Sequence, residues 1–98
     1  MKRGFVYIIT NKYHTVFYTG VTSDLISRII QHREKHLPNS FTAKYNCCKL
    51  VYYEYFEGIE AAIEQEKYIK GKKRSFKVQL IITKNLEFAD LWTEIKDW

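Results

Sequence analysis

Apolar and polar positions divide the chain into short segments of different period. The run Phe5–Ile9 is β-branched and aromatic throughout, which predicts a buried strand over 4–10. A second apolar run, Val16–Thr19, follows a polar connection, and so short a link predicts an antiparallel hairpin. The third strand is predicted over 49–56, where apolar and aromatic residues again dominate.

Helical spacing fills the intervals between and after these strands. Thr22-Ser23-Asp24 is an N-cap signature, and the apolar positions behind it predict an amphipathic helix from Asp24 to about Lys35. Residues 36–46, around the single proline, are predicted to form a loop. Gly58 interrupts the pattern, and a second helix is predicted over 59–70.

The last third of the chain is less regular. Residues 76–83 suit a strand as well as a helix, whereas Asn85 is expected to cap a final helix that carries Phe88, Leu91, Trp92 and Ile95 at helical spacing. The order ββαβααα indicates an α+β domain, a small antiparallel sheet with helices packed on it. We expect one domain over residues 1–98.

The composition and net charge of the chain indicate which classes of molecule it can bind. The chain has 98 residues, of which 46% are hydrophobic, and 16 Lys and Arg stand against 11 Asp and Glu for a net charge of +5. This balance favours polyanions as partners, chiefly nucleic acid or an anionic membrane surface. No apolar run approaches the ~20 residues of a membrane span. Cys47 and Cys48 are adjacent, which disfavours a disulfide between them, so we expect a cytoplasmic protein.

Two side chains on the first predicted helix have a spacing suited to phosphate chemistry. Arg28 and His32 lie at i and i+4, at the edge of the apolar arc. A cation and an imidazole so placed can hold a phosphate and move a proton. A solvated helix face with an ordinary histidine is the alternative interpretation.

Glu66 stands out on the second predicted helix because it falls inside the apolar arc, between Ile59 and Ala62. A carboxylate there needs a partner, since an unpaired buried charge is unfavourable. Lys70, an arginine from another element, or a divalent metal would serve. Mg²⁺ is commonly bound by only one or two protein carboxylates, with water as the remaining ligands. A structural ion pair is the alternative.

Several further residues are candidates for contacts with nucleic acid. The basic cluster fits a phosphate-backbone footprint or a solvated face, and comprises Lys67, Lys70, Lys72, Lys73, Arg74 and Lys77. Lys44 and Lys49 add charge elsewhere. Gly20, just before the first helix, is either a turn glycine or a site where a ligand approaches the backbone.

In this order, these segments resemble the GIY-YIG nuclease superfamily, and most closely its small single-domain bacterial members. The first half-motif is present as Gly4-Phe5-Val6-Tyr7 and the second as Tyr18-Thr19-Gly20. The match continues through Arg28 and His32, residues 41–46 and 50–54, and Glu66 with 69–72. Thr19 replaces the usual aliphatic residue of the second half-motif, and the glycine of the first lies one place further from its tyrosine.

The resemblance implies a three-stranded antiparallel sheet flanked by helices and a metal-dependent endonuclease that hydrolyses DNA, with structure-specific cleavage or DNA repair as its setting. Tyr7 and Tyr18 would face each other, with Tyr7 favoured for deprotonating the attacking water. Arg28 would neutralise phosphate charge, His32 would aid proton transfer, and Glu66 would hold Mg²⁺ or Mn²⁺. Substrate contacts are expected from Gly20, Lys44, Lys72, Lys73, Arg74 and Asn85.

Two other interpretations are kept open. One is a non-catalytic nucleic-acid-binding module on the same fold, indicated by the net charge and the tyrosines. The other is a protein-interaction domain that uses the aromatic residues Phe88, Trp92 and Trp98. A domain of this size makes few phosphate contacts, so we expect weak DNA binding or a partner protein that supplies specificity.

Overall fold

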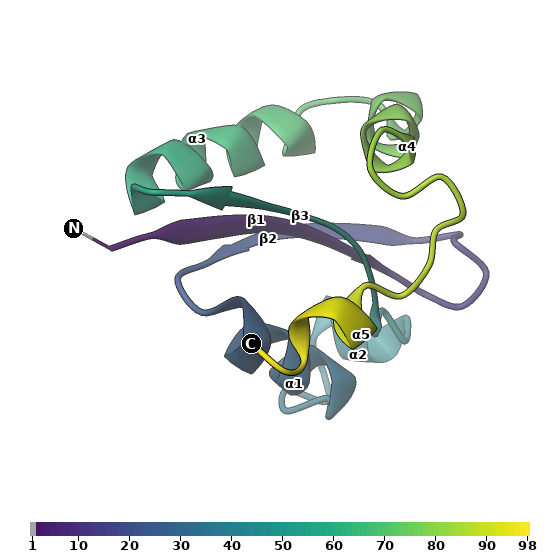
Figure 1. Ribbon diagram of the computed structural model, residues 1–98. Helices are drawn as coiled ribbons and strands as arrows, with labels where there is room; N and C mark the ends of the chain where they lie inside the picture. Colours follow the sequence, from purple (N-terminus) through teal and green to yellow (C-terminus); the bar gives the residue numbers. More distant parts are fainter. Residues whose placement is uncertain (1) are drawn as a thin grey trace.

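A three-stranded antiparallel sheet with helices on both faces forms the structure, a computed structural model that describes residues 2–98 (Figure 1). The strand order is β2-β1-β3, so β1 is central and β2 lies at one edge. The elements in chain order are β1 (Gly4–Thr10), β2 (Phe17–Thr22), α1 (Leu25–Arg33), α2 (Phe41–Lys44), β3 (Lys49–Phe56), α3 (Ile59–Lys70), α4 (Arg74–Ile82) and α5 (Trp92–Ile95). The predicted α+β class is confirmed.

The central strand β1 is buried along its whole length because it pairs on both sides and is covered on both faces. In this register Tyr7 lies opposite Gly20 of β2 and opposite Tyr53 of β3. Successive side chains of a strand point to opposite faces. Phe5, Tyr7 and Ile9 therefore join one core, and the residues between them join the other.

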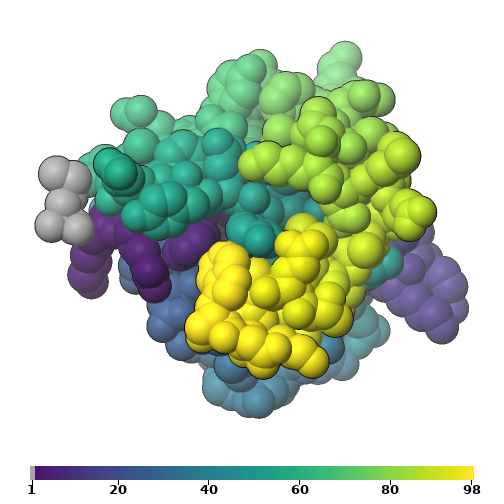
Figure 2. Space-filling view, viewed as in Figure 1, coloured from purple at the N-terminus to yellow at the C-terminus, as the bar shows by residue number. Residues whose placement is uncertain are grey.

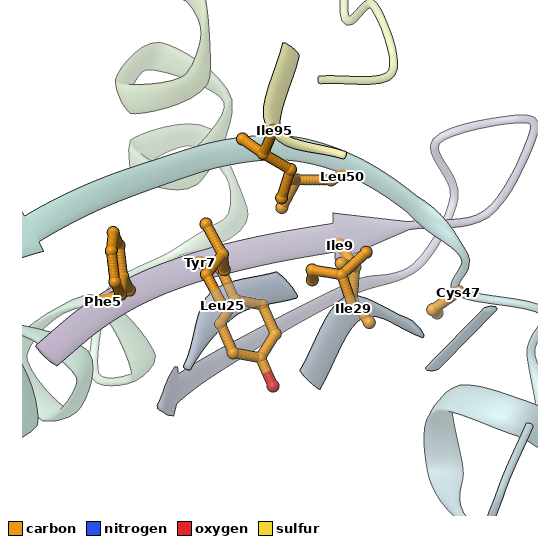
Figure 3. Close-up of a cluster of buried hydrophobic side chains, with 8 residues drawn as sticks. All are labelled: Phe5, Tyr7, Ile9, Leu25, Ile29, Cys47, Leu50 and Ile95. Atoms are coloured by element: carbon orange, nitrogen blue, oxygen red, sulfur yellow. The ribbon is translucent and has the colours of Figure 1, made fainter. Parts of the chain in front are cut away.

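The first core lies under the sheet, against α1 and the C-terminal segment (Figures 1 and 3). Its buried members are Phe5, Tyr7, Ile9, Leu25, Ile29, Cys47, Leu50 and Ile95. Figure 3 shows the Tyr7 ring extending from β1 with its hydroxyl oxygen at the far end. In Figure 2 the C-terminal residues, in yellow, lie against the blue atoms of the α1 region. One tyrosine thus brings a polar atom into an apolar cluster.

The second core lies on the opposite face, beneath α3 and α4 (Figure 1). Its buried members are Val6, Ile8, Val51, Tyr52, Ala62, Ile69 and Ile81. Helix α3 approaches the sheet closely at Gly4, where a Cβ would lie 2.7 Å from the Ala62 Cβ and 3.1 Å from the Ile59 Cα. The glycine of the first half-motif therefore makes room for this helix.

Three sequence predictions need correction or completion. Strand β2 extends to Thr22, beyond the predicted end at Thr19. The loop predicted over 36–46 contains the short helix α2, whose N-cap Ser40 accepts a hydrogen bond from the Ala43 N–H at 3.3 Å. The segment left open as strand or helix is helix α4.

The prediction for Asn85 is wrong, because this residue does not cap a helix. Its buried amide donates to the carbonyls of Val51 and Ala89, at 3.0 and 2.8 Å, and its Oδ1 accepts from the Ala89 N–H at 2.9 Å. These bonds hold a turn in which Phe88 has a φ of 54°. A single helix through 85–95 is thereby excluded, and α5 spans only Trp92–Ile95.

Among residues 2–98, none of the helices combines the length and the apolar character that crossing a bilayer requires.

Candidate active site

The Tyr7 phenol lies over Gly20 on the neighbouring strand. A Cβ built on Gly20 would lie 2.9 Å from the Tyr7 Cε1 and closer still to its Cζ and hydroxyl oxygen. Only a residue without a side chain leaves this space to the ring, so Gly20 has a packing role. It is not a turn glycine, since its φ is not positive.

The Tyr7 hydroxyl forms a hydrogen bond with His32 of α1. The Tyr7 Oη and His32 Nε2 are 2.9 Å apart, and His32 Nδ1 lies 3.0 Å from Thr42 Oγ1. Thr42 is buried in α2, and its hydroxyl also lies 3.3 Å from that of Ser40. Both imidazole nitrogens are thus engaged by hydroxyls, which fixes the orientation of the ring.

Burial governs the protonation of this pair. Desolvation, helped by the charge of Arg28, lowers the pKa of His32 to about 4, so the imidazole is neutral at pH 7. Desolvation, followed by the proximity of Tyr18, raises the pKa of Tyr7 well above its ordinary value, although Arg28 offsets part of that rise. The two groups therefore form a neutral phenol–imidazole pair.

Tyr18 and Arg28 lie beside the Tyr7–His32 pair and are partly exposed to solvent. They line a pocket of about 430 Å³ together with His32, whereas the fully buried Tyr7 does not line it. The His32 ring centre is 5.7 Å from that of Tyr7 and 5.7 Å from that of Tyr18. The half-buried placement predicted for Arg28 and His32 is confirmed.

Glu66 lies on α3, which covers the opposite face of the sheet from α1. Its carboxylate, 14% exposed, accepts a salt bridge from Lys70 Nζ at 3.0 Å, one of the partners the sequence left open. Lys70 Nζ also lies 5.8 Å from the Tyr18 ring centre, and the charge of Glu66 adds to the raised pKa of Tyr7. Glu66 is thus linked to Tyr18 through Lys70 and acts on Tyr7 through its charge.

The Glu66 carboxylate is suited to a hard cation that takes few ligands from the protein. Among residues 2–98, no group of three or more His, Cys, Asp and Glu side chains is gathered as a cation cage. Mg²⁺ accepts one carboxylate and completes its octahedron with water and phosphate oxygens, whereas Zn²⁺ would require more nitrogen or sulfur ligands. The partly exposed Glu66 carboxylate suits the former, and Lys70 would compete for it.

Two of the residues expected to contact the substrate, Asn85 and Arg74, form hydrogen bonds within the protein instead. The Asn85 amide is used in internal hydrogen bonds. Arg74 donates to the carbonyls of His14 and Thr15 in the β1–β2 loop and stacks over Phe17, 4.4 Å from its ring centre. The structure therefore gives both residues a role in stability.

The expected lysine contacts are exposed: Lys44 is the last residue of α2, and Lys72 and Lys73 lie between α3 and α4. Lys44 and Lys72 rest over Tyr45 and Tyr68, with Nζ 5.6 and 4.5 Å from the ring centres. Lys73 is the N-cap of α4, directly after the end of α3. All three charges remain accessible to a polyanion.

Sequence reasoning missed Thr42, which holds the far side of His32. The signal in the sequence is Ser40, two residues earlier, because serine is a common helix N-cap. Lys70 was considered as a partner of Glu66, but its proximity to Tyr18 depends on how α3 crosses the sheet.

Comparison with known proteins identifies relatives along nearly the whole chain. A model described as the GIY-YIG catalytic domain matches residues 3–79. A UPF0213 protein of Clostridium perfringens is 38% identical over 95 residues, covering 93% of this chain and 96% of its own. A UPF0213 protein of Syntrophus aciditrophicus is 30% identical over 81 residues, covering 83% and 92%.

A solved structure agrees with these matches. The solution NMR structure of a UPF0213 protein from Bacillus halodurans superposes with a TM-score of 0.58 at 28% identity, covering 90% of this chain and 92% of that one.

Proposed function

Because the chain belongs to the GIY-YIG catalytic domain family, we propose that it is a metal-dependent endonuclease that hydrolyses DNA phosphodiester bonds. The observation that carries the proposal is that Tyr7, Tyr18, Arg28 and His32 lie together on the α1 face of the sheet, while Glu66 of α3 is linked to Tyr18 through Lys70. These groups come from four elements, β1, β2, α1 and α3. A structural network alone does not require a cation, an imidazole and a carboxylate around one pair of tyrosines.

In this proposal Arg28 binds the scissile phosphate. Its guanidinium lines the pocket, and charge there stabilises negative charge that develops on the phosphate oxygens. Tyr18 lines the same pocket and orients the attacking water or a phosphate oxygen. Lys70, 5.8 Å from the Tyr18 ring, supplies further positive charge for the anion.

The structure supports a different division of labour between the tyrosines from the one expected of the sequence. Tyr7 is fully buried, its pKa is raised, and it lies behind Tyr18 and His32 as seen from the pocket. Tyr18 is therefore favoured as the tyrosine that contacts water, in place of Tyr7. Tyr7 would act through His32, holding the imidazole and exchanging a proton with it.

Glu66 would hold Mg²⁺ or Mn²⁺. When bound, such an ion supplies charge stabilisation for the leaving oxygen. The ion would have to compete with Lys70 for the carboxylate, since their salt bridge measures 3.0 Å. Binding of Mn²⁺ should thus be stronger in Lys70→Ala than in the natural chain, and paramagnetic broadening of NMR signals near Glu66 reports it without any cleavage.

Cleavage assays on Glu66→Gln and Arg28→Ala test the proposal, with duplex, nicked, flapped and single-stranded DNA as substrates. Each variant should lose at least a hundredfold in rate, and chelation by EDTA should abolish cleavage. Glu64→Gln is the matched control, because this carboxylate lies exposed on the same helix. Unchanged cleavage by Glu66→Gln would show that the activity does not belong to this site.

A binding module would behave differently in the same experiments. It would bind DNA with an affinity that falls steeply with salt but is indifferent to Mg²⁺ and to Glu66→Gln. Neutralising Lys72 and Lys73 would then weaken binding, and no cleavage would accompany it.

A further inference from the structure

The pocket beside the proposed catalytic residues is larger than a single phosphate requires. It continues from Arg28 along the C-terminal end of α1 to the start of α2, with a volume of about 430 Å³. The part beyond the proposed catalytic residues is lined by Gln31, Lys35, His36, Leu37, Ser40 and Phe41. Ligand sites of this volume typically enclose a small molecule or one unit of a polymer.

A flat aromatic surface forms one wall of this pocket. Phe41, the first residue of α2, is 48% exposed and belongs to neither core. Its ring centre lies 6.3 Å from that of Tyr18 and 4.8 Å from that of Tyr45. The Phe41 ring therefore lies between two aromatic neighbours, one of which, Tyr18, also lines the pocket.

The charge of the pocket matches an anion that carries a flat apolar group. Arg28 and Lys35 line it, and none of its ten lining residues is acidic. Gln31 offers an amide with both a donor and an acceptor, and Ser40 offers a hydroxyl. A nucleotide combines the three properties required, a phosphate, an aromatic face and a polar edge.

We propose that this pocket receives an unpaired nucleobase of the strand being cleaved, stacked on Phe41, while the adjacent phosphate lies at Arg28. This inference rests on the proposed function and specifies its substrate class, a nucleic acid that is single-stranded next to the scissile bond. A base within a duplex has both faces covered by its neighbours, so only an unpaired base can stack on a protein ring.

A second aromatic residue and a positive charge lie beside Phe41. Tyr45 is 42% exposed, and the Lys44 ammonium lies over its ring. A phosphate next to the stacked base can thus meet Lys44, and the Tyr45 ring is available to a neighbouring base if the lysine side chain moves to that phosphate. This mode of binding is tolerant of sequence because every base has an aromatic face.

The test compares oligonucleotides that carry 2-aminopurine, whose fluorescence is quenched by stacking, in Ca²⁺ so that binding is followed without Mg²⁺-dependent cleavage. Natural chain, Phe41→Ala and Phe41→Trp are titrated with single-stranded DNA, single-stranded RNA and blunt duplex DNA. Tyr13→Ala is the matched control, since Tyr13 is 75% exposed in the β1–β2 loop. Amide NMR spectra establish that each variant is folded.

Phe41→Ala should weaken single-strand binding by roughly 5- to 150-fold, the usual range for one stacked base, and Phe41→Trp should restore it. The salt dependence should not change, because no charge is removed. Equal affinity of Phe41→Ala and the natural chain for single strands would overturn the inference, as would tighter binding of blunt duplex. A preference between the DNA and RNA strands identifies which nucleic acid supplies the base.

Failure of this inference and failure of the proposed function are distinguishable. Cleavage that needs Glu66 but is indifferent to Phe41 on every substrate refutes the inference and leaves the nuclease in place. Stacking that depends on Phe41, with no cleavage of any substrate, supports the pocket and refutes the nuclease. Binding to none of the nucleic acids refutes both.

Discussion

Tyr7 and Gly20 face each other across the β1–β2 ladder, and the phenol of the first occupies the space that a side chain on the second would fill. The two half-motifs are therefore one packing unit. The glycine determines where the Tyr7 hydroxyl lies, and the hydroxyl in turn determines the position of His32 through their 2.9 Å contact.

Gly20→Ala should displace the Tyr7 ring. We expect loss of the Tyr7–His32 hydrogen bond, at least a tenfold fall in cleavage rate, and a loss of about 1–3 kcal/mol in the free energy of unfolding, since extra volume in a packed core forces side chains to move. The His32 imidazole signals and chemical denaturation measure these effects.

Gly71→Ala is the control for that substitution. A Cβ at Gly71 would lie 3.6 Å from the Lys67 carbonyl oxygen, an ordinary contact, and the residue has a helical φ of −77°. The free energy of unfolding of the Gly71→Ala variant should stay the same or rise by up to ~1 kcal/mol. If Gly20→Ala behaved like Gly71→Ala, the packing role assigned to Gly20 would be wrong.

Thr42→Val should release the far side of the His32 ring. The valine has nearly the same shape but leaves Nδ1 without its hydroxyl partner, so the imidazole can change tautomer and turn. We expect a change in the ¹⁵N shifts of both ring nitrogens, a loss of about 1–2 kcal/mol in stability, and about a tenfold lower cleavage rate. Thr42→Ser keeps the hydroxyl and should restore the shifts. Unaltered shifts in Thr42→Val would contradict the contact.

Stability should fall between pH 6.5 and pH 4 because of His32. Its folded-state pKa of about 4 lies below the ordinary 6.5, so the unfolded chain binds the extra proton first in this window. The free energy of unfolding should decrease as the pH falls through that range, by at most about 3 kcal/mol, since water at the half-buried ring screens part of the effect. His32→Gln should flatten this part of the profile, and a profile unchanged in the variant would argue against a neutral buried imidazole.

Asn85→Ala should destabilise the fold without altering DNA affinity. It removes three hydrogen bonds of a buried amide and leaves the Val51 carbonyl without that donor, for an expected loss of about 2–3 kcal/mol. Fluorescence anisotropy with DNA, measured below the melting temperature, should match the natural chain. Lys72→Ala is expected to have the opposite effect: it should weaken DNA binding and leave the free energy of unfolding unchanged. A selective loss of DNA affinity in Asn85→Ala would restore this residue to the substrate site.

Thr19→Val should stabilise the protein. The Thr19 hydroxyl is buried and, among residues 2–98, is the buried side-chain polar atom without a hydrogen-bond partner. Replacing it by a methyl group removes that unsatisfied donor and leaves the shape almost unchanged, so we expect a gain of about 1 kcal/mol. Thermal denaturation measures the gain. A loss instead would mean that the hydroxyl has a partner in solution.

Much of the fold is predictable because its elements have strong periods. The β-branched and aromatic run at 5–9 is typical of a buried strand, and the i, i+3, i+4 spacing on α1 and α3 predicts which faces are apolar. Glu66 was identified for the same reason, since a carboxylate inside an apolar arc is visible on a helical wheel. The sequence could not show that Lys70 reaches both Glu66 and Tyr18, because that depends on the crossing of α3 over the sheet.

The predictions that the structure corrects concern short segments. Such segments contain too few residues to show a helical or strand periodicity. Helix α2 has four residues, too few for a repeat, so Thr42 and Phe41 were assigned to a loop. Asn85 has the chemistry of a cap, but its side chain is used to bind two carbonyls from different segments. Residues 76–83 suit a strand or a helix by their spacing, and tertiary packing decides for α4, whose Ile81 is buried in the second core.

The position of Tyr7 on the central strand has a consequence for biosynthesis. β1 is made first but receives its two neighbours at different times. β2 follows directly, β3 begins only at Lys49, after α1 and α2, and Glu66 follows later still. A nascent chain on the ribosome therefore lacks the complete constellation until α3 has emerged and docked. The proposed nuclease would thus be inert during synthesis of the segments that precede α3, when a partly formed catalyst would lie next to the cell's nucleic acids.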